Sequence, residues 1–152
     1  MKRTAALLLL LAACSHDTIP GTQIPDEPKT RAVLDVFGQY KAALEARDAN
    51  ALYGLAAPSY YDPGDQVKGL GPTDYQSLPG KLQHDFDKVA GLKLEVTLKD
   101  VQVKGEEARV DYFQVLRYAV STPSGERWKS ESDDARMKLI KVGRDWKIAS
   151  GL

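Results

Sequence analysis

The second half of the sequence alternates between apolar and polar residues with a period of two, the spacing of a β-strand that has one covered face. In residues 92–98 every second residue is apolar, and beyond Lys99 and Asp100 the apolar positions continue at Val101 and Val103, out of phase by one. A slip of this kind predicts a β-bulge near residues 99 and 100. The pattern therefore indicates a sheet with one side against a core.

Three more strands are expected after this one. They are separated by the turn sequences KGEE, TPSGE and VGRD, and the third strand is expected to run from about Trp128. On the second strand one side carries Ala108, Val110, Tyr112, Gln114, Leu116 and Tyr118, and the other carries Arg109, Asp111, Phe113, Val115 and Arg117. The first of these sides is the more apolar, so we expect it to face the core.

The first half of the sequence has helical spacing instead. An apolar stripe at i, i+4, i+7 and i+11 begins at Val33, which predicts a long first helix with Thr30 as its N-cap. Asp48 is expected to cap a short second helix. That helix should stop near Pro58, because the residue before a proline avoids the helical region.

A third helix is predicted from the spacing of Thr73 and Gln76, which is that of a capping box. We expect this helix to continue to about Val89, with a kink or a broken start at Pro79. At 152 residues with 43% hydrophobic content, the chain can bury a single core. The sequence therefore predicts one α+β domain, with three N-terminal helices on one face of a four-stranded antiparallel sheet.

Two segments carry a resemblance to a known family. The order of elements, the segment YKAALEARDANALYGLAAPSYYD and the closing VGRDWKI resemble the NTF2-like superfamily, also described as SnoaL-like or cystatin-like cones. The resemblance covers residues 30–152. It implies a curved sheet that curls around the first helix, leaving a cone whose mouth can hold a small apolar molecule. Isomerases, dehydratases, hydrolases and non-catalytic modules share this fold, so the resemblance does not settle the function.

The first residues have the composition of an export signal. A short basic stretch, MKR, precedes the apolar run TAALLLLLAA, which is about half the length needed to span a bilayer. The segment LAAC resembles the lipobox of bacterial lipoproteins, which implies that Cys14 is lipidated after cleavage of residues 1–13. Two alternatives are that Cys14 merely follows an ordinary signal peptide or lies in a small buried helix.

The lipobox resemblance sets the expected organisation and location. Residues 14–29 hold three prolines and few apolar residues, which is typical of a flexible tether, and the folded domain is expected at residues 30–152. The acylated Cys14 would bind the lipid bilayer of a bacterial cell envelope. By resemblance to the sorting rule of enteric bacteria, Ser15 is compatible with the outer membrane, facing the periplasm.

Composition excludes several classes of chemistry. Basic and acidic residues both number 21, so there is no basic excess for nucleic-acid binding. With Cys14 used as the anchor, no disulfide or cysteine-based zinc site remains, and His16 and His84 are the only histidines. His84 is expected on a helix surface. We therefore expect neither a metal nor another cofactor.

The candidate ligand-binding residues lie on the side of the sheet expected to face the cone, or near its mouth. They are Tyr61, Asp62, Tyr112, Gln114, Tyr118 and Asp133. A tyrosine and an aspartate sharing a cavity could supply a proton donor and a base, as an enolising isomerase requires. The alternatives are that the tyrosines are core or rim aromatics and that Asp133 is solvated. No residue is assigned a catalytic role.

Three functions remain open. The leading interpretation is an envelope lipoprotein whose domain binds a small apolar molecule or acts as a scaffold. The second is a small isomerase, dehydratase or hydrolase acting on an apolar substrate. In the third, the outer sheet face around Phe113 and Val115 docks an envelope protein or a second copy of the chain.

Overall fold

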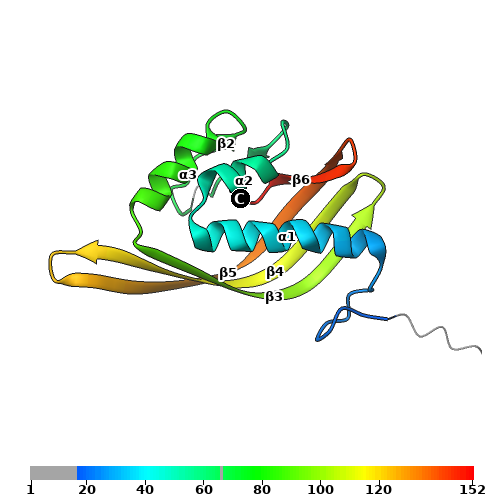
Figure 1. Ribbon diagram of the computed structural model, residues 1–152, viewed down its shortest axis with the longest axis horizontal. Coiled ribbons are helices and arrows are strands. Elements are labelled where there is room, and N and C mark those ends of the chain that lie inside the picture. Colours follow the sequence, from blue (N-terminus) through cyan, green and yellow to red (C-terminus); the bar gives the residue numbers. More distant parts are fainter. Residues whose placement is uncertain (1–16, 66) are drawn as a thin grey trace, which may run out of the picture.

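The computed structural model describes residues 17–65 and 67–152 (Figure 1). The expected signal peptide, Cys14, Ser15 and His16 lie outside these residues. The elements are α1 (Pro28–Ala46), α2 (Ala49–Leu55), β1 (Tyr61–Asp62), β2 (Thr73–Asp74), α3 (Leu78–Asp87), β3 (Gly91–Lys104), β4 (Glu107–Thr122), β5 (Gly125–Val142) and β6 (Asp145–Ser150).

The last four strands form one antiparallel sheet in the order β3-β4-β5-β6, with the helices on one side of it (Figure 1). This confirms the α+β class and the helix-covered sheet. The register of β3 against β4 shifts between Leu98 and Asp100, which confirms the predicted bulge. The β4–β5 hairpin extends past α3 as an arm (Figure 1). Strand β5 begins at Gly125, before the start expected near Trp128.

The core lies between α1 and the inner face of the sheet. Val33, Phe37 and Tyr40 of the predicted stripe are buried there. The carboxylate of Glu45, at the end of α1, accepts a hydrogen bond from the backbone N–H of Leu94 at 2.9 Å. Because β3 is an edge strand, this contact occupies one of its free backbone donors.

The starts of the first two helices test the capping predictions. Asp48 caps α2 as expected, accepting from the N–H of Ala51 at 2.9 Å. Helix α1 instead begins at Pro28, and Thr30 is buried within its first turn. The prediction of Thr30 as N-cap is wrong because proline, with its fixed φ and no N–H, suits the first helical position.

The start of α3 differs from the predicted capping box. Thr73 pairs in strand β2, and the helix begins at Leu78. A turn between Asp74 and Ser77 precedes it, closed by the Ser77 N–H donating to Asp74 Oδ1 at 2.8 Å and the Asp74 N–H donating to Ser77 Oγ at 3.0 Å. Pro79 then lies in the first turn, where its missing N–H costs no helical bond.

Residues 17–27 make a turn that is fixed to the domain. The N–H of Ile19 donates to Ile24 O at 2.9 Å, and Asp26 forms an ion pair with Arg31 of α1. The Ile24 side chain is 3% exposed and joins the core. The described part of the expected tether is therefore ordered, because the domain buries the Ile24 side chain. A single buried residue of this kind produces no periodic pattern in the sequence.

In the portion of the chain described here, no helix is both long and apolar enough to cross a membrane.

Candidate functional site

The inside of the cone is filled by side chains. Tyr112 is buried there, and its ring packs edge-on against Phe37 with 4.8 Å between centroids. Burial raises the pKa of Tyr40 well above its usual value, and the neighbouring Tyr112 raises it further. Other buried side chains of this core are Val33, Leu52, Leu94, Val110, Met137, Leu139, Trp146 and Ile148. Tyr112 is thus part of the core beneath α1.

Gln114, Tyr118 and Asp133 lie farther along the same face, toward the arm. Gln114 and Asp133 are direct cross-strand partners, so the structure brings these two together. Tyr118 is half-buried, and its hydroxyl donates to Glu131 Oε1 at 2.6 Å. That hydrogen bond raises the pKa of Tyr118.

Asp133 is exposed on the arm. It forms an ion pair with Lys68, which belongs to the loop between β1 and β2. The hydrogen bond from Lys68 lowers the pKa of Asp133. Asp133 is therefore a solvated carboxylate that joins a loop to the arm.

The two adjacent tyrosines at the mouth of the cone have opposite environments. Tyr60 is 2% exposed and Tyr61 is 56% exposed. The hydroxyl of Tyr60 accepts from the N–H of Leu152 at 3.2 Å, and burial raises the pKa of Tyr60 to about 12. Tyr60 closes the end of the core, and Tyr61 points into solvent.

Asp62 is the candidate that lines a hollow at the mouth. This hollow has a volume of about 220 Å³ and is also lined by Leu70, Thr73, Lys81 and Leu152. Both carboxylate oxygens of Asp62 are engaged, one by the N–H of Gly64 at 2.8 Å and the other by the N–H of Gly151 at 3.1 Å. Asp62 thus holds the mouth loop to the end of the chain.

The chemistry available inside the cone is limited by its polar groups. Among the described residues, the buried side chains that carry a hydroxyl are those of Thr30, Thr73, Tyr40, Tyr60 and Tyr112, and no carboxylate is buried. Proton abstraction beside a carbonyl needs a positioned base within hydrogen-bond reach of the substrate. The same residues contain no group of three or more His, Cys, Asp or Glu side chains placed to hold a metal.

Arg109, Asp111 and Phe113 lie on the outer sheet face, as predicted, but the sequence did not show which charged side chains pair there. Asp111 accepts a hydrogen bond from Arg136 Nε at 2.6 Å and lies 2.9 Å from Arg109 Nε. Phe113 is partly exposed on the same face, with Lys99 Nζ 5.9 Å from its ring centroid. The alternation of β4 could have shown that Arg109 and Asp111 share a face. Only the strand register shows that Arg136 of β5 joins them.

Comparison with known proteins gives the fold. Searches against known protein families and curated relatives find no match. A protein from Kribbella flavida is similar at a TM-score of 0.70 and 11% identity, over 81% of this chain and 88% of that one. An NTF2-like superfamily protein from Salmonella enterica Typhimurium matches at 0.65 and 11% identity, over 80% and 86%. The chain has the NTF2-like fold.

A third similar structure carries the name of an enzyme. A ketosteroid isomerase-like protein from Erwinia carotovora atroseptica matches at a TM-score of 0.67 and 15% identity, over 82% of this chain and 93% of that one. At this identity the likeness concerns the backbone, because the residues that line a site are free to differ.

Proposed function

We propose that the protein is an envelope lipoprotein, anchored through an acylated Cys14, whose NTF2-like domain is a binding or scaffold module and not a catalyst. The observation that supports a binding or scaffold role over catalysis is the filled cone. Its interior is occupied by Tyr40, Tyr112 and apolar side chains, and no carboxylate among the described residues is buried there. Because this filled interior also leaves no room for a ligand, binding is expected at the hollows of the mouth or of the outer face.

The sequence supports a lipid anchor at Cys14, and the fold limits how far the domain can lie from the bilayer. Asp17 begins the described turn, three residues after Cys14, and three residues span at most about 10 Å. A domain acylated at Cys14 is therefore held close to the bilayer. Several acyl chains on one cysteine give stable membrane attachment.

The anchor is tested by the mass of the mature protein. Wild type and Cys14→Ala are expressed in a bacterial host and recovered from the membrane and soluble fractions. The wild type is expected in the membrane fraction, with a mass that fits cleavage before Cys14 plus acylation. The variant is expected to lack the acyl mass. Equal masses after allowance for the substitution would end this part of the proposal.

The binding role is tested by native mass spectrometry of the Cys14→Ala protein purified from its own host. A retained small molecule supports a binding module, and a retained protein chain supports a docking role for the face around Phe113. Because the mouth hollow is lined by Asp62 and Leu70, Leu70→Ala is expected to reduce retention of a small apolar molecule there. Turnover of such a molecule by the purified protein would contradict the non-catalytic role.

A small isomerase, dehydratase or hydrolase is the second candidate. It is favoured by the fold shared with the ketosteroid isomerase-like protein and by Asp62, which lines the mouth hollow and which, added to the effect of burial, raises the pKa of the neighbouring Tyr60 by its charge. Both oxygens of Asp62 already accept backbone hydrogen bonds, so a role as base requires one of these bonds to open. Any activity that Asp62→Asn abolishes without loss of fold would establish this candidate.

A further inference from the structure

The outer face of the sheet contains a like-charge pair where adjacent strands meet. In the strand register Gln102 lies opposite Arg109, and Arg109 lies opposite Lys138. Like charges directly opposite each other on neighbouring strands are destabilising. Two cations therefore lie side by side on the outer face, near the turn between β3 and β4.

Acidic residues balance one member of this pair and not the other. Arg109 has Asp111 at 2.9 Å and Asp100 at 3.5 Å. Lys138, and Lys104 at the end of β3, form no ion pair with any described residue. Because Glu107 lies directly opposite Lys104 in the strand register, the charge without an acidic neighbour across the strands is that of Lys138.

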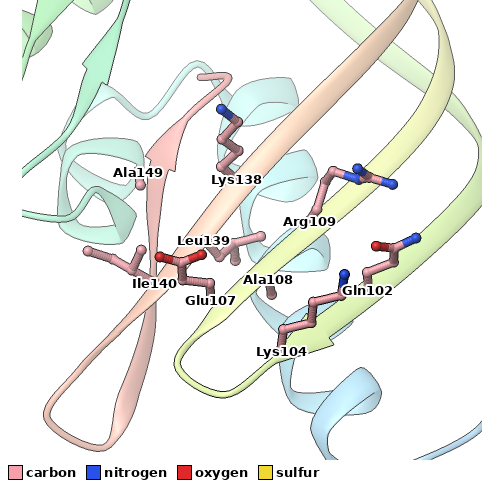
Figure 2. Close-up of a pocket in the computed structure, with 9 residues that line it drawn as sticks. All are labelled: Gln102, Lys104, Glu107, Ala108, Arg109, Lys138, Leu139, Ile140 and Ala149. Carbon is pink, nitrogen blue, oxygen red and sulfur yellow. The ribbon is translucent and has the colours of Figure 1, made fainter.

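These cations line a hollow of about 400 Å³, which we call the basic hollow (Figure 2). Its residues are Gln102, Lys104, Glu107, Ala108, Arg109, Lys138, Leu139, Ile140 and Ala149. Three of them are cationic and one, Glu107, is acidic. On the side toward β6, Ile140 and Ala149 supply apolar surface, and the Glu107 carboxylate lies beside Ile140 (Figure 2).

We propose that the basic hollow binds a phosphate-bearing anion. Adjacent strands are about 5 Å apart, so one tetrahedral group can reach side chains from both β4 and β5. Its several oxygens can accept from the Lys138 ammonium and the Arg109 guanidinium together. Ile140 and Ala149 then contact the organic part of the ligand. This site lies outside the cone and does not depend on acylation.

Two sources could supply this group, a free organic phosphate or a lipid headgroup. The turn between β3 and β4, the turn between β5 and β6 and the start of α1 lie at one end of the molecule, the right-hand end in Figure 1. The basic hollow adjoins the first of these turns through Lys104 and Glu107. The chain enters the domain near this end, so a bilayer that holds the N-terminus would lie close to the hollow.

The test uses the chain from residue 14 onward with Cys14→Ser, so that neither acyl chains nor the apolar leader contribute to binding. Inorganic pyrophosphate and glycerol 3-phosphate are titrated by calorimetry, and phosphatidylglycerol and phosphatidylcholine vesicles are compared by co-sedimentation. The variant is Lys138→Gln. The matched control is Lys129→Gln, which removes the same charge from the exposed arm of the same strand. Circular dichroism and thermal unfolding show that both variants fold.

We expect saturable binding of the phosphates or of phosphatidylglycerol vesicles, weakened about tenfold by Lys138→Gln and unchanged by Lys129→Gln. Binding of soluble phosphates alone identifies a free ligand. Binding of phosphatidylglycerol vesicles that pyrophosphate displaces identifies a headgroup. Absence of binding by the parent chain, or equal weakening in both variants, would overturn the proposal. Loss of acylation at Cys14 would leave these results unchanged, so the two proposals fail separately.

Discussion

The two faces of β4 and β5 differ more than any other two regions of the molecule. Toward the helices, Val110, Tyr112 and Leu139 are buried in a core without carboxylates. Toward the opposite side, residues one position away carry charge, as in Arg109 and Lys138. The same two strands thus supply a filled interior and an open polar surface.

This difference shows where recognition is to be sought. In a cone with an empty interior, the inner face would hold the ligand. Here the inner face stabilises the fold, while the hollows lined by charged side chains lie at the mouth and on the outer face. If the two faces divide these roles, substitutions on the inner face should lower stability more than substitutions on the outer face.

The strongest contrast is between neighbouring residues of β5. Leu139→Ala leaves a cavity in the core and is expected to lower the free energy of unfolding by about 2–5 kcal/mol. Lys138→Gln, on the outer face, is expected to leave it nearly unchanged. Urea unfolding followed by circular dichroism measures both. If the two changes were similar in size, β5 would not separate core from surface.

Alkaline pH provides a second test of the inner face. The unfolded chain ionises Tyr60 near pH 10, but burial holds its pKa at about 12 in the folded state. The contribution of the un-ionised Tyr60 to the free energy of unfolding is therefore full below pH 10 and is lost as the pH rises through 12. Between pH 9 and pH 12, the Tm of wild type is expected to fall by about 5 °C more than the Tm of Tyr60→Phe, because phenylalanine does not ionise. Tyr61→Phe, the exposed neighbour, should behave as wild type.

On the outer face, substitution of Asp111 is expected to lower Tm most. Its side chain is only 18% exposed and contacts both Arg109 and Arg136. Asp111→Asn removes the negative charge that these guanidinium groups share, so Tm is expected to fall by about 3 °C. Asp134→Asn, which affects one exposed pair with Lys99, is the control. A larger loss in the control would show that the cluster around Asp111 adds no stability.

The smallest effect is expected at the arm. Asp133 and Lys68 are both exposed and joined by a single ion pair, and exposed pairs contribute little to stability. Asp133→Asn is expected to change Tm by less than about 1 °C. A large drop, measured by differential scanning calorimetry, would show that the loop between β1 and β2 is held to the arm by more than this contact.

Much of the fold could be predicted from local patterns. The alternation from Leu92 onward placed the strands and their bulge, and Asp48 marked the start of a helix, because both signals act over a few residues. The start of α3 could not be predicted. Thr73 belongs to strand β2 and pairs with Asp62, eleven positions earlier, a contact that no local pattern contains.

Less of the candidate site could be predicted, because its contacts join distant segments. Sequence order does not show that Tyr60 turns inward and Tyr61 outward, since that depends on where the chain end brings Leu152. The pairing of Asp133 with Lys68 joins residues 65 positions apart. Cys14 lies outside the described residues, and its lipidation stays a prediction.

The sequence by itself determined the three helices, the four strands of the sheet, which side of each of these strands is apolar and that a single core is buried, because side-chain periodicity fixes these locally. Only the tertiary structure decided what the inner side encloses and which charges meet on the outer side. Packing of α1 against the sheet fills the cone, and the register of β4 against β5 sets Lys138 beside Arg109. Register is a property of paired strands, so no single stretch of sequence contains it.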